Sequence, residues 1–445
     1  MTIRIVSSIL LLLCGAVMVI AWCLPDTMPI TGVAWLGADP DAIRELVVRL
    51  MPYVVLVCLT ALAAGALNVR GHYRASNWGP ILFNVGWVSA IVGVGVTWGW
   101  ESQGGRPPEE VMAMVRALGW GVLAAGFVQL LVQLPALKSM GYFRRSSLDQ
   151  THKAKAWKVL RDALPLVVGA AVYQLNVLID GWMAEGMLPD GGPTLYYYAN
   201  RLQQLPMALI SISASTAVFP ALLAMGQGGR LAELRALHDN TQLGSVFLLL
   251  PASVGLFVLA GPEISVLLEH GEFGPEGVTR TTPALQYLTL ALLPGGASIL
   301  ATRVYYSLGD KRTPVVYSVL TMGLNTGLNI LFLQGLGMDI EGLALGTAIS
   351  SWAHLSLLLW GHRRLGLPTA TSGSAGMIFK VLSASLLMGW VASWAESTLS
   401  EPWGETTALF AAIVLGALTY FLLAAALRIP VQKELLAKIS KRLTR

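Results

Sequence analysis

Arg201 stands inside a stretch that is otherwise apolar enough to lie in a lipid bilayer, LYYYANRLQQLPMALISISASTAVFPALLA, residues 195–224. An ionisable side chain at the bilayer centre costs about 2.5–3.5 kcal/mol on insertion scales, so it faces a cavity, a partner or the interface. The planar donor fork of a guanidinium matches phosphate oxygens. Tyrosines before Arg201 mark an interface, and Pro206 after it should bend the helix. Two interpretations follow: Arg201 snorkels among the tyrosines, or it lines an aqueous cavity and binds an anionic group.

Oxygen-bearing side chains recur on three other apolar segments. Asp180 follows Asn176 by four residues in YQLNVLIDGWMA, and Asn325 and Asn329 are four apart in GLNTGLNI, so each pair shares one helix face. Thr347 lies in the next segment, LALGTAISS. Carboxylate, amide and hydroxyl oxygens are the ligands of hard cations, so a cation site is one interpretation. Interhelical hydrogen bonding by buried Asn and Thr is the alternative.

Two further ionisable side chains stand within apolar runs. Arg303, in TRVYYSLGDKRTP, lies one to two turns from the end of its segment, so it either snorkels or binds an anion. His354, in SSWAHLS, favours a hydrogen-bonded structural histidine over a proton relay.

Catalysis has little support in the sequence. We find no nucleophile motif, phosphate-binding loop, CxxC pair, glycine-rich nucleotide fingerprint or pair of acids for hydrolysis. The cysteines, Cys14, Cys23 and Cys58, are odd in number and lie in or beside apolar runs, which argues against a disulfide framework. We expect neither an enzyme nor an organic cofactor, and no use of ATP by this chain alone.

The composition is that of a polytopic membrane protein. Hydrophobic residues make up 55% of the chain and charged residues 12%, and the mean hydropathy is +0.63. A soluble domain carries about 25% charged residues. The chain therefore satisfies its backbone within membrane helices, which predicts an all-α fold. The net charge of +5 does not indicate nucleic-acid binding, because the basic residues lie mostly in short loops between the apolar segments.

Twelve segments are long enough to cross a bilayer. The first follows Arg4 and is long for a cleaved signal peptide, so we predict a retained span. The predicted spans are 5–24, 51–69, 80–99, 113–134, 164–185, 196–222, 242–261, 283–307, 314–334, 341–361, 377–394 and 406–427. Most Lys and Arg lie before the first span, in every second connection and in the tail, which predicts that both termini are cytoplasmic.

Two basic segments lie between or after the predicted spans. The connection 136–162, with FRRSSLDQTHKAKAWKVLRD, is expected to form an amphipathic helix on the membrane surface, with a solvated linker as the alternative. The tail 429–445 contains VQKELLAKISKRLTR and is expected to be an interfacial helix.

Five segments, in order, resemble the MurJ (MviN) family of lipid II flippases in the MOP exporter superfamily. They cover nearly the whole chain and are ALNVRGHYRASNWGPILFNVG, LVQLPALKSMGY, YYYANRLQQLPMALISISASTAVFPALL, LLEHGEFGPEGVTRTTPAL and RVYYSLGDKRTPVVYSVL. The resemblance implies two lobes around a cationic central cavity that opens alternately to each side. It implies transport of an undecaprenyl-pyrophosphate-linked peptidoglycan precursor, lipid II, from the cytoplasmic to the periplasmic leaflet of the bacterial inner membrane.

The resemblance also assigns candidate site residues. Arg201 resembles a cavity arginine of the family, and Asn200 stands where an acid is usual. With Tyr197 and Arg303 these residues form the candidate cargo site. Some members of the family look sodium-coupled through the spans that carry the second set, which makes sodium the candidate ion and Asn329 a departure, because an acid is more usual there. The candidate sodium ligands are Asp180, Asn325, Asn329 and Thr347.

The implied domain organisation has five parts. They are an N-lobe at 1–135 with four spans, the linker 136–162, a C-lobe at 163–362 with six spans, a pair of spans at 363–428 that resembles a lipid-tail groove, and the tail 429–445. The family has fourteen spans, and the first span here resembles the family's third, so we expect an N-lobe without the first two. We also expect a monomer in contact with membrane lipids, with cell-wall synthesis proteins as candidate partners.

Two other functions stay open at this point. One is a related MOP exporter, either a polysaccharide-lipid flippase or a MATE-like antiporter. An antiporter of that class would need acids in the N-lobe spans, and the first four predicted spans contain no Asp or Glu. The other is a truncated remnant or scaffold that does not transport.

Overall fold

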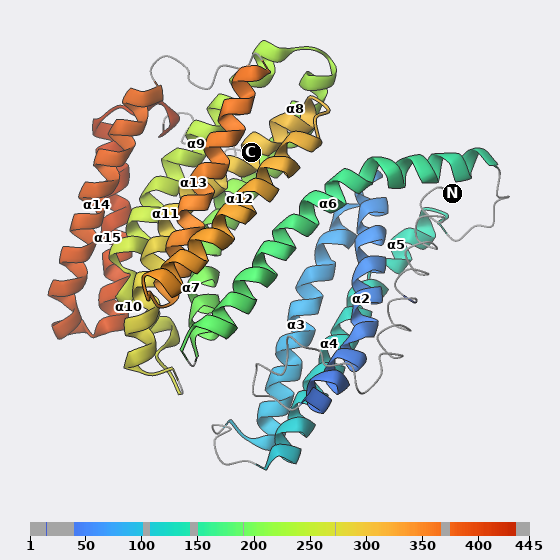
Figure 1. The fold of residues 1–445 in the computed structure, drawn as a ribbon, viewed down its shortest axis with the longest axis horizontal. Coiled ribbons are helices and arrows are strands. Elements are labelled where there is room, and N and C mark those ends of the chain that lie inside the picture. Colours follow the sequence, from blue (N-terminus) through green and yellow to red (C-terminus); the bar gives the residue numbers. More distant parts are fainter. Residues whose placement is uncertain are drawn as a thin grey trace. The chain divides into compact units, whose positions relative to one another are not determined.

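The computed structural model describes residues 15, 40–100, 107–142, 150–189, 191–271, 273–365 and 374–432. These residues are helical and contain no β-strand (Figure 1). Ten helical segments among them are long and apolar enough to cross a membrane, and they match ten of the predicted spans in order, which confirms the all-α membrane fold. The fifth predicted span lies within the 38-residue helix α6 (Gln150–Met187). The first, 5–24, lies outside the described residues except for residue 15.

The chain divides into two compact units, Met1–Leu164 and Pro165–Arg445. The first contains α2 (Pro40–Val69), α3 (Tyr73–Trp98), α4 (Pro108–Leu131) and the short α5 (Leu134–Ser139). A left-handed Gly71 with φ 79 makes the tight turn from α2 to α3, which any other residue would strain. Ser76 on α3 donates a hydrogen bond of 2.6 Å to Asn68 Oδ1 on α2 and fixes this hairpin.

The helix α6 crosses the boundary between the units without a break. The segment predicted as a linker helix and the fifth predicted span therefore share one helix from Gln150 onward.

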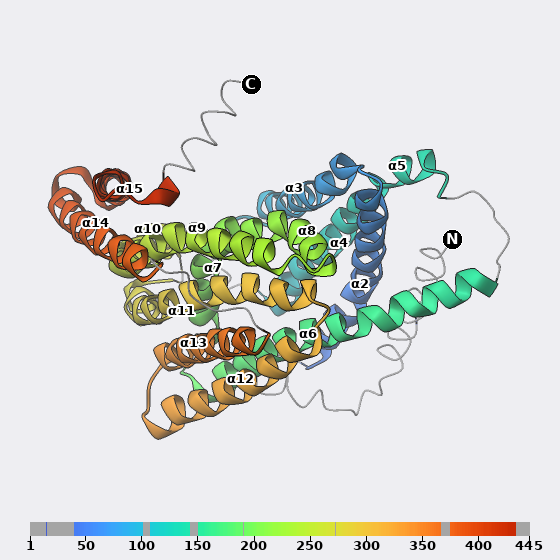
Figure 2. The same cartoon turned by 90° about the horizontal axis from the view of Figure 1, so that it is seen from above.

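The second unit continues from α6 through nine α-helices and two π-helical turns. They are α7 (Gly192–Met207), η2 (Ala208–Ile212), α8 (Ser213–Gln227), α9 (Leu231–Val258), α10 (Ala260–Leu268), α11 (Pro275–Ser307), α12 (Arg312–Ile330), η3 (Leu331–Gly335), α13 (Ile340–Arg364), α14 (Ser374–Trp403) and α15 (Glu405–Ala426). The helix α11 is central. In its most apolar stretch 61% of the residues are buried, whereas the figure is 39% for α13, the next most buried span. Figure 2 shows α11 between α9 and α13.

The bend predicted at Pro206 takes the form of the π-helical turn η2, which begins two residues later. Ser213 Oγ donates to the carbonyl oxygen of Ala208 at 3.0 Å and satisfies one acceptor that the wide turn leaves. Gly296 on α11 lies against the turn, because a Cβ there would overlap Ser211 Oγ. The segment from α7 to α8 thus stays helical but contains a wide turn of a kind often found at functional sites.

Candidate functional site

Asp180 on α6 is buried, with 6% of its surface exposed, and it is surrounded by amides. Its Oδ1 accepts a hydrogen bond from Asn329 Nδ2 at 2.8 Å, and its Oδ2 accepts one from Asn176 Nδ2 at 3.1 Å. The side-chain amide of Asn325 is assigned the orientation in which both its nitrogen and its oxygen have hydrogen-bond partners. Its nitrogen then donates to Asp180 Oδ1 at 2.9 Å, and its oxygen accepts from the backbone N–H of Thr347 at 3.3 Å. The four residues considered as sodium ligands thus lie together, at the meeting of α6, α12 and α13.

The charge on Asp180 has no basic partner in the described part of the chain, where the ion pairs involve other acids. A buried carboxylate is costly unless it is neutralised. Asn329 Oδ1 is also buried, and it has no hydrogen-bond partner among the described residues. One negative charge, one unsatisfied amide oxygen and the oxygens of Asn325 and Thr347 fit a monovalent cation with oxygen ligands.

The helix α7 reaches this cluster through a tyrosine. Tyr196 is buried, with 7% exposure, and its hydroxyl lies 3.2 Å from Thr347 Oγ1, within hydrogen-bond distance. Arg201 follows five residues later on the same helix. The helix that carries the candidate cargo arginine is therefore also a wall of the Asp180 cluster.

Arg201 itself is exposed and held by its own helix. Its Nε donates to the Tyr197 hydroxyl at 2.9 Å, and its Nη1 donates to Gln204 Oε1 at 3.3 Å. The Gln204 amide in turn donates to Asn200 Oδ1 at 2.9 Å. A chain of hydrogen bonds thus joins Arg201, Tyr197 and Asn200, and no carboxylate forms an ion pair with Arg201 among the described residues.

Arg303 does not join this group. Its guanidinium stacks on the ring of Phe219, with 4.7 Å from Cζ to the ring centroid. Phe219 follows Arg201 by 18 residues on the helical segment from α7 to α8. That separation is roughly 27 Å along a helix, too long for one pyrophosphate to contact both arginines. Of the cargo residues suggested by the sequence, only Arg201, Asn200 and Tyr197 are brought together.

An apolar groove of about 400 Å³ lies between α9, α14 and α15. Its lining includes Met388, Gly416 and Tyr420, together with Glu263 on α10. Burial raises the pKa of Glu263 from its ordinary value of 4.5 to about 7. The last two predicted spans therefore form one wall of a groove that suits a hydrocarbon chain and carries a single carboxyl group.

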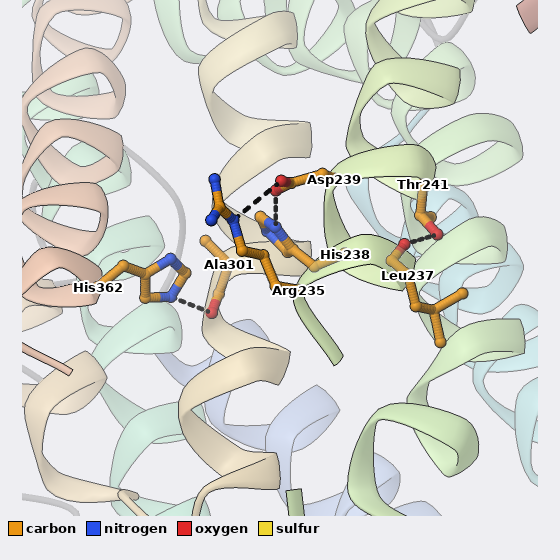
Figure 3. A network of polar contacts seen from close by, with 7 residues as sticks. All are labelled: Arg235, Leu237, His238, Asp239, Thr241, Ala301 and His362. Atoms are coloured by element: carbon orange, nitrogen blue, oxygen red, sulfur yellow. Dashed lines mark hydrogen bonds and ion pairs between the residues drawn. The ribbon is translucent and has the colours of Figure 1, made fainter. Parts of the chain in front are cut away.

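A further polar network, which the predicted site residues do not include, lies in the second unit (Figure 3). His238 Nδ1 lies 3.1 Å from Asp239 Oδ1, and Arg235 Nε lies 3.5 Å from Asp239 Oδ2. His362 Nε2 lies 3.2 Å from the carbonyl oxygen of Ala301, and the two histidine rings meet edge to face at 5.7 Å. The pair Arg235 and Asp239, four residues apart, was a signal available in the sequence. The network ties α9, α11 and α13 together.

Solved structures share this helical architecture. The chain superposes on "Inward-facing conformation of a multidrug resistance MATE family transporter of the MOP superfamily" with a TM-score of 0.64 and 15% identity, covering 80% of this chain and 79% of the other. It superposes on "Lipid II flippase MurJ, inward closed conformation" with a TM-score of 0.72 and 20% identity, covering 95% and 82%. The chain therefore shares its fold with these two membrane proteins.

Sequence comparison resolves the family. Residues 2–415 match the family described as "Lipid II flippase MurJ". The probable lipid II flippase MurJ of Bdellovibrio bacteriovorus is 29% identical over 385 residues, which cover 84% of this chain and 68% of the relative. The lipid II flippase MurJ of Burkholderia cenocepacia is 26% identical over 425 residues, 91% and 79% of the two chains. The protein of Rhizobium meliloti is 29% identical over 331 residues, 72% and 58%.

The chain belongs to the lipid II flippase MurJ family, which confirms the resemblance of its motifs. It is accordingly a multi-pass membrane transporter and not an enzyme.

Proposed function

We propose that this chain is a flippase that moves lipid II from the cytoplasmic to the periplasmic leaflet of a bacterial inner membrane by alternating access. One observation carries the proposal: the exposed guanidinium of Arg201 sits within a span and has no carboxylate partner in the described part of the chain. Such a charge is costly in lipid, so it favours a site where an anion enters. Membership of the flippase family supports a lipid-linked pyrophosphate as that anion.

The geometry of α7 suits such an anion. Tyr197 and Gln204 fix the guanidinium, so little side-chain freedom remains to be lost when a phosphate binds. These two contacts use Nε and one N–H of Nη1, and three N–H donors remain for phosphate oxygens. Binding that differs between the inward-open and outward-open states would then favour transport in one direction. The apolar groove beside α14 and α15 offers a surface for the polyprenyl tail.

A monovalent cation at Asp180 is part of the proposal, with sodium as the first candidate. Asp180, Asn325, Asn329 and Thr347 would hold it, and its charge would neutralise the buried carboxylate. Because Thr347 contacts Tyr196, occupancy of this cluster would change the packing of the helix that carries Arg201. The cation gradient would then bias the transport cycle.

The test is transport of fluorescent lipid II in liposomes that contain the purified protein. Arg201→Gln removes the charge but keeps a polar side chain, and Arg230→Gln is the matched control because Arg230 is an exposed arginine paired with Glu233. Hydrogen bonds to charged groups contribute about 1.5–3 kcal/mol, so Arg201→Gln should slow transport roughly tenfold to a hundredfold. Arg230→Gln should leave the rate unchanged.

Two outcomes would overturn the proposal. Equal transport rates for Arg201→Gln and Arg230→Gln would remove Arg201 from the cargo site. If the unaltered protein moves no lipid II but exchanges a soluble organic cation for sodium or protons, an antiporter replaces the flippase.

A further inference from the structure

A polar pocket of about 250 Å³ lies in the second unit between α6, α11, α12 and α13. Asn176, Asn325 and Thr347 belong both to its lining and to the cluster around Asp180. The pocket is therefore continuous with that cluster. Its volume is enough for several water molecules, each of which occupies about 30 Å³ in the liquid.

The pocket extends from the cluster toward the predicted cytoplasmic ends of the helices. Its lining runs from Asn325 back to Ser318 on α12 and from Thr347 forward to His354 on α13. Seven residues of α-helix cover roughly 10 Å. Ser318 is six residues from Arg312, where α12 begins. The cytoplasmic end of the pocket, called its inner end below, therefore lies roughly 9 Å from that end of the helix.

The lining presents oxygen lone pairs. Four hydroxyls donate to the carbonyl four residues earlier in their own helix, at 2.7–2.9 Å, and they belong to Ser318, Thr321, Ser350 and Ser351. Because each hydroxyl proton is used in that bond, the oxygen is left to accept. Ser298 Oγ is buried and has no partner within the described structure, so it too is available. Buried polar atoms of this kind call for a ligand or water.

The same lining disfavours other occupants. The residues described as lining the pocket include no Lys, Arg, Asp or Glu, and His354 is the one titratable side chain among them. An anion would find no charged donor there. An apolar ligand would displace the water that hydrates the hydroxyls, which costs free energy. His354 Nδ1 lies 3.2 Å from Thr321 Oγ1, which gives the histidine a partner at the inner end of the pocket.

We propose that this pocket is a hydrated route by which a monovalent cation passes between Asp180 and the cytoplasmic side, with Thr321 and His354 at its inner end. This route rests on the cation coupling proposed above. It adds that the path of the cation leads from Asp180 to the cytoplasmic side. Hydroxyl oxygens replace part of the water shell of the cation along the way, and the carboxylate at the end supplies the charge that attracts it.

Cysteine accessibility tests the route without relying on transport. In a protein whose Cys14, Cys23 and Cys58 are replaced, Ser318→Cys and Ser351→Cys place a thiol in the pocket. Each is treated in proteoliposomes with a small cationic methanethiosulfonate, which needs a thiolate and hence water. The matched control is Ser356→Cys, which lies on α13 like Ser351. Ser356 also donates to the carbonyl four residues earlier, but it is exposed and outside the pocket lining.

The pocket cysteines should react at least about tenfold faster than Ser356→Cys. Ser356 is exposed within a span, where the surroundings are lipid, and a thiol in apolar surroundings stays protonated. Sodium chloride should slow this reaction relative to choline chloride, and Asp180→Asn should abolish that protection. Equal rates for pocket and control cysteines, or fast reaction without protection by Na⁺, K⁺ or Li⁺, would overturn the route.

The flippase proposal is judged separately, by lipid II transport in the same cysteine variants. A variant that transports but does not react refutes only the cation route. A protein that reacts with sodium protection but moves no lipid II refutes only the flippase.

Discussion

Gly346 on α13 offers the sharpest test of the Asp180 cluster. A Cβ at this position would overlap Asn329 Oδ1 and would lie 3.4 Å from Asn329 Cγ and 3.7 Å from the side-chain amide of Asn325. The amide of Asn329 must therefore turn or move away if Gly346 is replaced by alanine. Its hydrogen bond of 2.8 Å to Asp180 would be lost.

The size of the effect follows from two opposing terms. A hydrogen bond to a charged group contributes about 1.5–3 kcal/mol, and its loss is felt fully because Asp180 is buried. Alanine is better than glycine inside a helix by about 1 kcal/mol. Gly346→Ala should therefore lower the free energy of unfolding by about 0.5–2 kcal/mol. Gly323→Ala is the matched control: its Cβ would meet nothing within 4 Å, so only the favourable helix term remains.

The measurement is thermal unfolding of the purified protein in detergent, followed by tryptophan fluorescence with and without sodium chloride. Gly346→Ala should unfold at a lower temperature than the unaltered protein, and Gly323→Ala at the same or a higher one. The rise in Tm expected with sodium should shrink in Gly346→Ala alone. If both variants are equally stable and respond equally to sodium, the amide of Asn329 does not lie against Gly346.

Three other predictions rest on single contacts. Gly296→Ala should destabilise the packing of α11 on the π-helical turn by about 1–3 kcal/mol because the new methyl overlaps Ser211, and a Tm within error of the unaltered protein would contradict this. Glu263→Gln should be stabilising at pH 8 by up to about 3 kcal/mol and neutral near pH 4: a raised folded-state pKa penalises the ionised form as pH rises from 4.5 through about 7, so an equal effect at both pH values would refute it. Asp339→Asn should weaken the two-point contact with Arg280, at 2.6 and 3.1 Å, and lower stability by about 1 kcal/mol at low salt; the same loss at high salt would show that the charge is not responsible.

The sequence was sufficient for features that depend on local spacing. Apolar length located the spans, because a helix must be long enough to cross a bilayer whatever its neighbours are. Spacing of four residues put Asn325 and Asn329 on one face of α12, and both contact Asp180 in the structure. A proline in the span predicted a bend, although the π-helical form of the turn was not foreseen.

Features that join distant segments were beyond the sequence. Arg201 and Arg303 looked alike as arginines in apolar runs, and only the fold shows that the helical segment from Arg201 to Phe219 separates them. The contact of His238 with His362 joins α9 to α13 across more than a hundred residues, and no local pattern predicts such a pairing. The partner of a buried polar group depends on helix packing, which spacing within one helix cannot supply.

The position of helix α7 explains how the Arg201 site and the Asp180 cluster can be coupled. Successive residues turn by about 100° around a helix, so Tyr196 and Arg201 point roughly 140° apart. Tyr196 faces inward to Thr347, and Arg201 is exposed on the other side. A rotation or shift of α7 that moves Arg201 must therefore also change the contact between Tyr196 and Thr347. Coupling between an anion at Arg201 and a cation at Asp180 then needs no long chain of residues, because a single helix borders both sites.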